Sequence, residues 1–259
     1  MDKVVASAVD AVNDIPDEAS LAVGGFGISG IPAVLIEAVR DRGIRNLEIV
    51  SNNCGLDGVG LGTLLDNMQI RRIVASYVGE NKEFARQFLS GELEVELTPQ
   101  GTLAERLRAA GVGIPAFYTL TGAGTQIEEG GLPWRYRDGG QVALASPPKR
   151  TEVFDGTSYV LETALRTDFA LIRAWKGDRH GNLVFRKSAR NFNPVCAMAG
   201  AISIAEVEHL VEPGDIEPDA IHLPGIYIDR IVELTPEQAA DKAIEKRTVR
   251  SCLAVKGGF

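Results

Sequence analysis

The chain has few of the residues that build metal centres, disulfide frameworks or histidine-dependent active sites. Its three cysteines, Cys54, Cys196 and Cys252, are odd in number, far apart and without metal-ligand spacing. We therefore expect reduced thiols, a reducing compartment such as the cytoplasm, and no metal site. His180, one of three histidines, lies in a turn-like Gly-Asp-Arg-His-Gly-Asn segment with no serine or cysteine motif beside it, which disfavours a histidine-dependent hydrolase.

Excess positive charge and long apolar runs are also missing. Lys and Arg number 27 against 35 Asp and Glu, and the net charge of −8 argues against a nucleic-acid partner and against an anionic membrane surface. No apolar run approaches the ~18 residues of a membrane span. Residues 1–10 predict the start of an amphipathic helix rather than a signal peptide. We expect a soluble cytoplasmic protein.

What the sequence does contain is a regular alternation of strand-like and helix-like segments. Apolar runs predict strands at residues 21–23, 47–50, 71–77 and 93–97, and helical periodicity follows at residues 31–42, 60–68, 82–90 and 101–110. Further strands are predicted at residues 159–162, 169–174, 183–185 and 201–207. Repeated βα units indicate an α/β fold with an open, mostly parallel sheet and helices on both faces.

The domain organisation is read from the breaks in this alternation. We expect one domain over residues 1–234. Residues 132–151 are expected as a surface excursion, for which a hairpin is one form, because they are rich in Gly, Pro and basic residues. Residues 235–259 are expected as a tail, with a charged helix over residues 235–250 and a frayed end.

A glycine-rich loop follows the first predicted strand, and Pro32 then opens the first long helix. Its residues are Gly24, Gly25, Phe26, Gly27, Ile28, Ser29 and Gly30. Glycines let the backbone approach a ligand, and free N–H groups at a helix start attract an anion. The Gly-x-Gly-x-x-Gly spacing also matches the dinucleotide fingerprint, but Glu48 lies inside the next strand and Asn52 and Asn53 stand where the ribose-binding acid belongs.

The other loops at the carboxyl ends of the predicted strands supply amides more than acids. They are residues 51–53, 76–81 and 98–101, and Glu80 is the carboxylate among them. Such an edge suits stabilisation of a developing oxyanion better than removal of a proton. Glu80 fits either a nucleophile or base, or an ordinary residue at a helix start. The edge therefore resembles half of an active site.

Two other features have a structural and a functional interpretation. Cys54 follows Asn53 near the edge, where a small buried thiol is the simpler interpretation. Residues 186–194 contain a basic cluster and an Asn-Phe-Asn-Pro run. A solvated helix face, a phosphate contact and a subunit interface fit this segment equally well.

Several motifs occur together, in order, over residues 24–232. They are Gly24-Gly-Phe-Gly-Ile-Ser-Gly-Ile-Pro32, Ser51-Asn-Asn53, Ser76-Tyr-Val-Gly-Glu-Asn81, the run from Glu92 to Arg106, Lys176-Gly-Asp-Arg-His-Gly-Asn-Leu183 and Ala189-Arg-Asn-Phe-Asn-Pro194. The set resembles the A subunits of class I CoA-transferases, most closely the succinyl-CoA:3-ketoacid (3-oxoacid) group, and implies the α/β fold of that family.

The resemblance implies CoA transfer through a covalent glutamyl-CoA intermediate on a partner B subunit, with coenzyme A as a substrate and no tightly bound cofactor. The family's nucleophile stands in a Ser-Glu-Asn-Gly setting that Glu80 lacks. Gln100 resembles the amide near the reacting carbonyl, Asn52 and Asn53 resemble substrate-pocket residues, and residues 24–30 match the segment designated a CoA site.

Other functions remain open at this point. Within the family these are 3-oxoadipate and acetate/acetoacetate CoA-transferases. Outside it, they are a self-sufficient isomerase or hydrolase that uses Glu80, and a module that only binds CoA. The longer stretch at residues 132–151 and the tail beyond residue 234 depart from the family pattern without touching its motifs.

Overall fold

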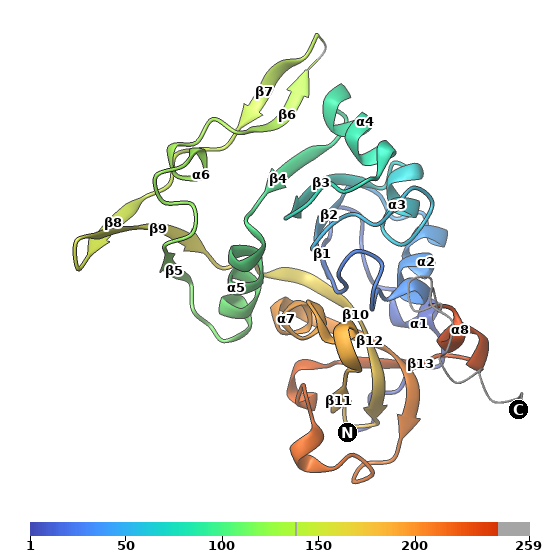
Figure 1. The fold of residues 1–259 in the computed structure, drawn as a ribbon. Helices are drawn as coiled ribbons and strands as arrows, with labels where there is room; N and C mark the ends of the chain where they lie inside the picture. The colour runs from blue at the N-terminus through green and yellow to red at the C-terminus, as the bar shows by residue number, and fades with distance from the viewer. Residues whose placement is uncertain (138, 243–259) are drawn as a thin grey trace, which may run out of the picture.

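The computed structural model describes residues 1–137 and 139–242 and contains a central, mostly parallel sheet. In the described residues its strands follow the order β13-β12-β10-β1-β2-β3-β4, and the short β11 pairs antiparallel with β10 (Figure 1). The bounds are β1 Ser20–Val23, β2 Leu47–Val50, β3 Ile70–Ala75, β4 Glu94–Leu97, β10 Thr167–Asp178, β11 Leu183–Val184, β12 Gly200–Val211 and β13 Arg230–Glu233. The expected sheet is confirmed.

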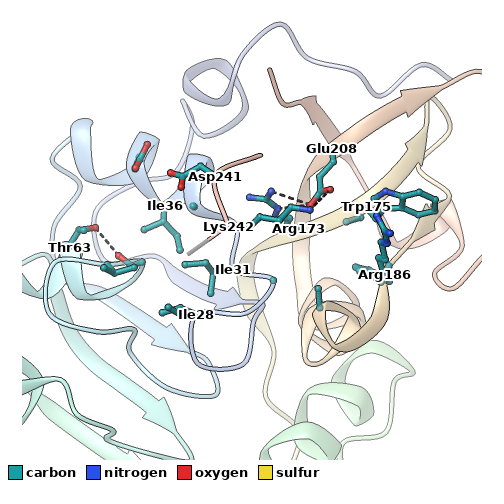
Figure 2. A pocket seen from close by; sticks show the side chains of 18 of the residues that line it. Ile28, Ile31, Ile36, Thr63, Arg173, Trp175, Arg186, Glu208, Asp241 and Lys242 are labelled. Atoms are coloured by element: carbon teal, nitrogen blue, oxygen red, sulfur yellow. Dashed lines mark hydrogen bonds and ion pairs between the residues drawn. The ribbon is translucent and has the colours of Figure 1, made fainter. Parts of the chain in front are cut away.

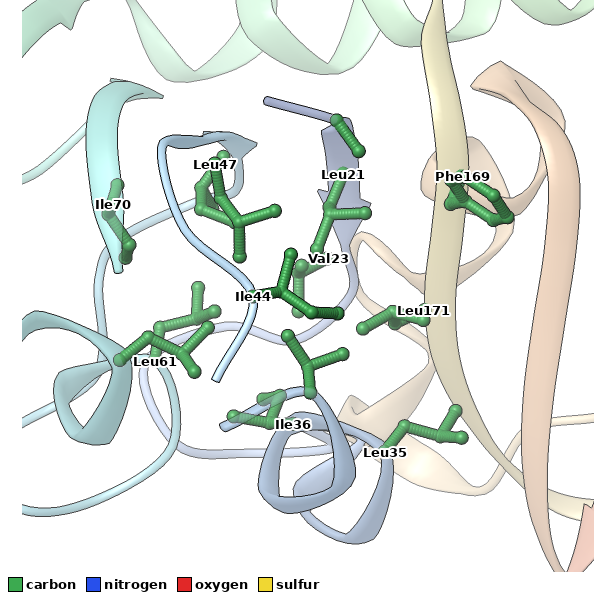
Figure 3. Close-up of a cluster of buried hydrophobic side chains, with 14 of the residues drawn as sticks. Leu21, Val23, Leu35, Ile36, Ile44, Leu47, Leu61, Ile70, Phe169 and Leu171 are labelled. Atoms are coloured by element: carbon green, nitrogen blue, oxygen red, sulfur yellow. The ribbon is translucent and has the colours of Figure 1, made fainter. Parts of the chain in front are cut away.

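Helices cover both faces of this sheet, as the βα alternation predicted. One face carries α1 Ala8–Ala11, α2 Ala33–Asp41, α3 Gly62–Asp66 and α4 Lys82–Ser90, and the other carries α5 Gln100–Gly111 and α7 Asn193–Ala199 (Figure 1). Leu21 and Val23 belong to the core under the first set, shown in Figure 3, whereas Ala22 belongs to the core under the second. Side chains that alternate along one strand thus fill two separate cores.

Helix α4 shows why the local prediction succeeded. The side chain of Asn81 accepts the N–H of Phe84 at 2.8 Å and begins the helix. Gly91 ends the helix with φ +83°, a conformation that glycine adopts without strain. Both signals lie within the segment itself, so the predicted range, residues 82–90, is the observed one.

A second, antiparallel sheet projects from the central domain, and the sequence pattern did not indicate it. It consists of β5 Ala116–Thr119, β9 Thr157–Thr163 and β8 Thr151–Phe154, in that order (Figure 1). The strand predicted at residues 159–162 is part of β9. A short helix, α6 Gln126–Glu129, follows β5.

Residues 132–151 contain the hairpin of β6 Pro133–Arg137 and β7 Gln141–Ala145. The hairpin lies beside β4 and contacts α4 and β3: the ring of Tyr136 lies 5.2 Å from that of Phe88 in α4, and Arg72 of β3 lies 5.5 Å from the ring of Trp134.

The two ends of the described chain differ from the predictions. Residues 1–6 are not helical: Val4 bridges Ile231 beside β13, and only Ala8–Ala11 form a helix. At the other end, α8 Pro236–Ala240 begins with a capping box at Thr235 and stops at Ala240. The prediction of a helix is wrong for Asp241 and Lys242, which are described and not helical. Residues 243–250 of the predicted helix lie outside the described residues. Short 3-10 helices occupy Lys187–Arg190, Pro218–Ala220 and Gly225–Tyr227.

Candidate functional site

Four loops meet at one edge of the central sheet because β1, β2, β3 and β4 are parallel neighbours. Hydrogen bonds connect the loops: Ser51 Oγ donates to the carbonyl of Val23 at 2.8 Å, and Asn52 Nδ2 donates to Ser76 Oγ at 2.9 Å. Ser76 Oγ in turn donates to the carbonyl of Asn52 at 3.0 Å. These bonds hold the ends of β1, β2 and β3 together.

The two candidate asparagines at this edge are almost completely buried. Asn52 is 3% exposed and Asn53 is 7% exposed. Besides the bond from Asn52 to Ser76, Asn53 Oδ1 accepts the N–H of Gly55 at 3.4 Å. Both amides are thus held in fixed orientations, which is what a rigid substrate pocket needs.

Gln100 is the first residue of α5 and its side chain is exposed. Pro99 precedes it and makes no side-chain bond to the helix start, so no side-chain cap occupies the first N–H groups of α5. Amide and backbone donors at the carboxyl end of β4 together form a suitable region for a developing negative charge.

A buried ion network fixes the turn from β4 into α5. Glu96 accepts from Arg106 at 2.7 Å and from Arg72 at 2.5 Å, and Arg106 Nε donates to the carbonyl of Thr163 at 2.8 Å. Burial alone would raise the pKa of Glu96, but the charges of Arg106 and Arg72 outweigh it and hold that pKa below its ordinary value. The network also connects β9 to α5, the helix that begins at Gln100.

Glu80, the candidate carboxylate, is exposed and does not cap the helix that follows it. That role belongs to Asn81 and to Asp57, whose Oδ1 accepts the N–H groups of Lys82 at 2.8 Å and Glu83 at 3.2 Å. Glu80 is therefore not a capping residue of α4, whereas its interpretation as a residue that stabilises the helix dipole stays a prediction. Its place at the edge beside solvent leaves it as the low-ranking alternative for a nucleophile.

The glycine loop is a tight turn that bonds largely to the chain itself. Phe26 and Ser29 exchange two backbone hydrogen bonds of 3.0 Å, and the N–H of Gly24 donates to the carbonyl of Leu171 at 2.9 Å. At the start of α2, the N–H of Leu35 donates to the carboxylate of Glu206 at 3.0 Å. The expectation that free N–H groups at this helix start face a ligand is wrong for Leu35, because Glu206 of β12 supplies the acceptor.

Asn191 and Asn193 hold the loop from the opposite side. Asn191 Nδ2 donates to the carbonyl of Ser29 at 3.0 Å, and Asn193 Nδ2 donates to the carbonyl of Gly30 at 3.0 Å. A Cβ atom on Gly24 would lie 2.0 Å from Asn193 Oδ1, so only glycine fits there. These two asparagines therefore hold the glycine loop in place, and the three interpretations of residues 186–194 stay predictions.

The same turn occurs a second time, thirty residues later in the chain, after β2. Leu56 and Val59 exchange backbone bonds of 3.3 and 3.0 Å, as Phe26 and Ser29 do after β1. Phe26 is 49% exposed and Leu56 is 38% exposed, at equivalent positions of the two turns. The spacing of glycines in residues 25–30 and 55–60 carried this signal, and the sequence analysis did not detect it.

A pocket of about 310 Å³ lies beside the two turns, next to the point where β1 pairs with both β2 and β10 (Figure 2). Crevices at such reversals of strand order are common ligand sites. Ile28 and Ile31 supply apolar surface, and Arg186 lies 5.5 Å from the ring of Trp175. Arg173 also lines it, donating to Glu208 at 3.1 Å. A pocket with apolar and charged walls suits an amphipathic ligand.

The two described cysteines are structural. Cys54 and Cys196 are fully buried, and burial raises the pKa of each thiol well above its ordinary value. In a Cys252→Ser variant, we expect both thiols to be unreactive toward Ellman's reagent in the native chain and both to react after unfolding in denaturant. Rapid labelling of Cys54 in the native chain would contradict its assignment as a buried thiol.

Taken with the fold, the loops collected at one carboxyl edge define the class of α/β proteins whose ligand sites lie at the ends of parallel strands. A family model described as coenzyme A transferase matches residues 5–234. The chain belongs to the coenzyme A transferase family. Within the described residues, none of the helices is both long and apolar enough to cross a bilayer.

Individual relatives are similar over nearly the whole chain. A Mycobacterium tuberculosis protein, named as the probable A subunit of a succinyl-CoA:3-ketoacid coenzyme A transferase, is 66% identical over 250 residues, which cover 96% of this chain and all of that protein. The rat mitochondrial succinyl-CoA:3-ketoacid coenzyme A transferase 2A is 49% identical over 96% of this chain, which spans 47% of the rat protein.

Two solved structures are similar in fold to this chain. The acyl-CoA transferase of Escherichia coli O157:H7, in a thioester complex with CoA, superposes with a TM-score of 0.76 and 27% identity. The alignment covers 92% of this chain and 48% of that protein, so this chain spans about half of it. The structure of glutaconate coenzyme A-transferase from Acidaminococcus fermentans shares the fold, with a TM-score of 0.74 and 20% identity, over 93% of this chain and 78% of that one.

Proposed function

We propose that this chain is the A subunit of a succinyl-CoA:3-ketoacid CoA-transferase, which moves CoA from succinyl-CoA to a 3-oxo acid such as acetoacetate. The full-length similarity to a relative named as the A subunit of such an enzyme carries the proposal. The edge supports it, because Gln100 has an exposed amide there and Asn52 and Asn53 lie buried at the same edge. Of the carboxylates at this edge, Asp57 caps a helix and Glu80 is an exposed side chain.

The proposed reaction uses a glutamate of a B subunit. Its carboxylate attacks the thioester carbonyl of succinyl-CoA and expels the CoA thiolate, which leaves a mixed anhydride. The thiolate then attacks the glutamyl carbonyl of the anhydride, forms a glutamyl-CoA thioester and releases succinate. The carboxylate of the acceptor repeats these steps in reverse and leaves as its CoA ester. Each attack passes through an oxyanion that needs hydrogen-bond donors.

This chain contributes donors and shape to those steps. Gln100 supports the oxyanion, and Asn52 and Asn53 line the pocket for the acid. Residues 24–30 contact coenzyme A, and Ile28 and Gly30 already form part of the wall of the 310 Å³ pocket. We further propose that residues 1–234 form one CoA-transferase domain and residues 235–259 an appended tail.

Reconstitution tests the proposal. We expect the pure chain to transfer no CoA, and an equimolar mixture with a B subunit that carries the Ser-Glu-Asn-Gly motif to form acetoacetyl-CoA from succinyl-CoA. Turnover of a thioester by the chain alone would favour the alternative of a self-sufficient hydrolase or isomerase that uses Glu80. A mixture that binds CoA without transfer would favour a binding module.

The acceptor acid is tested in the same mixture. Residues 76–81 and 91–106 resemble the succinyl-CoA:3-ketoacid group most closely, so we expect acetoacetate to be the better acceptor than 3-oxoadipate or acetate in direct competition. A preference for one of the latter would reassign the substrate and leave the place of this chain in a two-subunit transferase intact. Size-exclusion chromatography of the mixture distinguishes a heterodimer from a heterotetramer.

A further inference from the structure

Glu206 is a buried carboxylate that the proposed reaction does not use. It lies in the middle of β12 with 0% exposure. One carboxylate oxygen accepts the N–H of Leu35, the third residue of α2, at 3.0 Å, and the other lies 3.4 Å from Arg173 Nη1. A buried charge is retained only where it is paired and hydrogen-bonded, so the carboxylate, the helix start and the guanidinium form one unit.

This unit changes the chemistry of the glycine loop. An anion-binding loop needs several free N–H groups that converge on the ligand. At the start of α2, the N–H of Ala33 donates to the carbonyl of Ile31 at 2.9 Å, and that of Leu35 donates to Glu206 at 3.0 Å. A phosphate at the start of α2 would have to displace a carboxylate that Arg173 also holds.

The unit formed by Glu206, Arg173 and the start of α2 is connected to the glycine loop by further hydrogen bonds. Arg173 donates its backbone N–H to Asn193 Oδ1 at 3.0 Å, and Asn193 Nδ2 holds the carbonyl of Gly30 at 3.0 Å. On the other side of the loop, the carbonyl of Val23 accepts from Ser51 Oγ at 2.8 Å, directly before Asn52. The loop therefore lies between Glu206 and the substrate-pocket asparagines.

We propose that Glu206 is a positioning residue that supplies the hydrogen-bond acceptor at the start of α2 from within the chain and so fixes the glycine loop beside residues 51–53. As a consequence, the loop contacts coenzyme A through its tip, residues 26–29, of which Phe26 is exposed, and not by binding a phosphate at the start of α2. The second statement rests on the proposed function, whereas the first is a property of the chain alone.

Three variants test this assignment. Glu206→Ala removes the acceptor for the Leu35 N–H, and Glu206→Gln keeps an acceptor oxygen of the same reach. Glu208→Ala is the matched control, because Glu208 lies on the same strand and pairs with Arg173 at 3.1 Å, whereas the bond to α2 comes from Glu206. Each variant is examined as the pure chain and after reconstitution with the B subunit.

The first readout is independent of activity. We expect faster hydrogen–deuterium exchange of the amides at the start of α2 in Glu206→Ala, and wild-type exchange there in Glu206→Gln and Glu208→Ala. Formate, compared with chloride at equal ionic strength, should raise the melting temperature of Glu206→Ala and not that of the wild type. Wild-type exchange in Glu206→Ala, or equal stabilisation of the wild type by formate, would overturn the proposal.

The second readout uses the reconstituted enzyme. Because a small displacement of a positioned group lowers turnover strongly, we expect Glu206→Ala to lower kcat by about 10²-fold. Formate should restore part of the loss, and Glu206→Gln should stay within about threefold of wild type. If Glu206→Ala does not fold, Glu206→Gln decides alone, and a 10²-fold loss there refutes the positioning role. Inactive wild-type mixtures would refute the proposed function while leaving the exchange result valid.

Discussion

We expect the replacement of Gln100 by alanine to lower kcat of the reconstituted enzyme by about 10² to 10³, because the proposed reaction would then lose one donor to the oxyanion. The side chain is exposed at the first position of α5 and is absent from the buried ion network of Glu96, so the variant keeps its stability. The measurement is steady-state acetoacetyl-CoA formation, with the melting temperature as a check on folding.

Glu80→Gln is the matched control for that experiment, since it changes another exposed polar side chain of the edge. We expect a far smaller loss of kcat, and an unchanged covalent CoA adduct on the B subunit by mass spectrometry. Loss of that adduct in Glu80→Gln, or a label on a peptide of this chain after trapping and digestion, would show that the nucleophile belongs to this chain and not to its partner.

We expect the free energy of unfolding of the wild-type chain to fall, relative to that of Glu206→Gln, as the pH rises from about 4.5 to about 7. Burial raises the pKa of Glu206 from its ordinary value of 4.5 to about 7, although Arg173 and the N–H groups of Leu35 and Val34 lower it in part. Glu37 adds a further upward contribution to that pKa. At pH values between these two limits the unfolded chain releases the proton and the folded chain retains it.

The sign follows from proton binding by the two states. Below pH 4.5 the group is protonated in both, and the folded state carries no penalty for it. Through the window the folded state binds more protons than the unfolded state, so the free energy of unfolding decreases as the pH rises. The difference between a pKa of 4.5 and one of about 7 corresponds to a change of roughly 3 kcal/mol in the free energy of unfolding.

Urea denaturation of wild type and Glu206→Gln at a series of pH values measures this difference. The free energy of unfolding of Glu206→Gln should rise relative to that of the wild type between pH 4.5 and about 7, and the difference between the two should be constant above about pH 7. A difference independent of pH would mean that Glu206 titrates alike in both states. A difference of opposite slope would mean that Arg173 outweighs burial and lowers the pKa instead.

Local signals carried the predictions that succeeded. The N-cap of Asn81 and the left-handed Gly91 lie at the two ends of α4 and need no distant partner. The placement of Asn52, Asn53 and Gln100 at one edge needed one further rule, that strands in βα units are parallel. The antiparallel sheet of β5, β9 and β8 gave no comparable signal, because its strands are short and β5 pairs with a segment far along the chain.

The amino-acid sequence by itself determined the layered α/β fold, the edge at which the loops gather and the amides that they carry, since periodicity, capping residues and motif order are written locally. Only the tertiary structure decided which group accepts the N–H of Leu35 at the start of α2, beside the glycine loop. Glu206 and Leu35 are 171 residues apart, and β10 lies between β12, which carries Glu206, and β1, which precedes α2. The N–H groups at a helix start bond to whichever acceptor the fold brings to them, and nothing near Leu35 in the sequence specifies that this acceptor belongs to the chain.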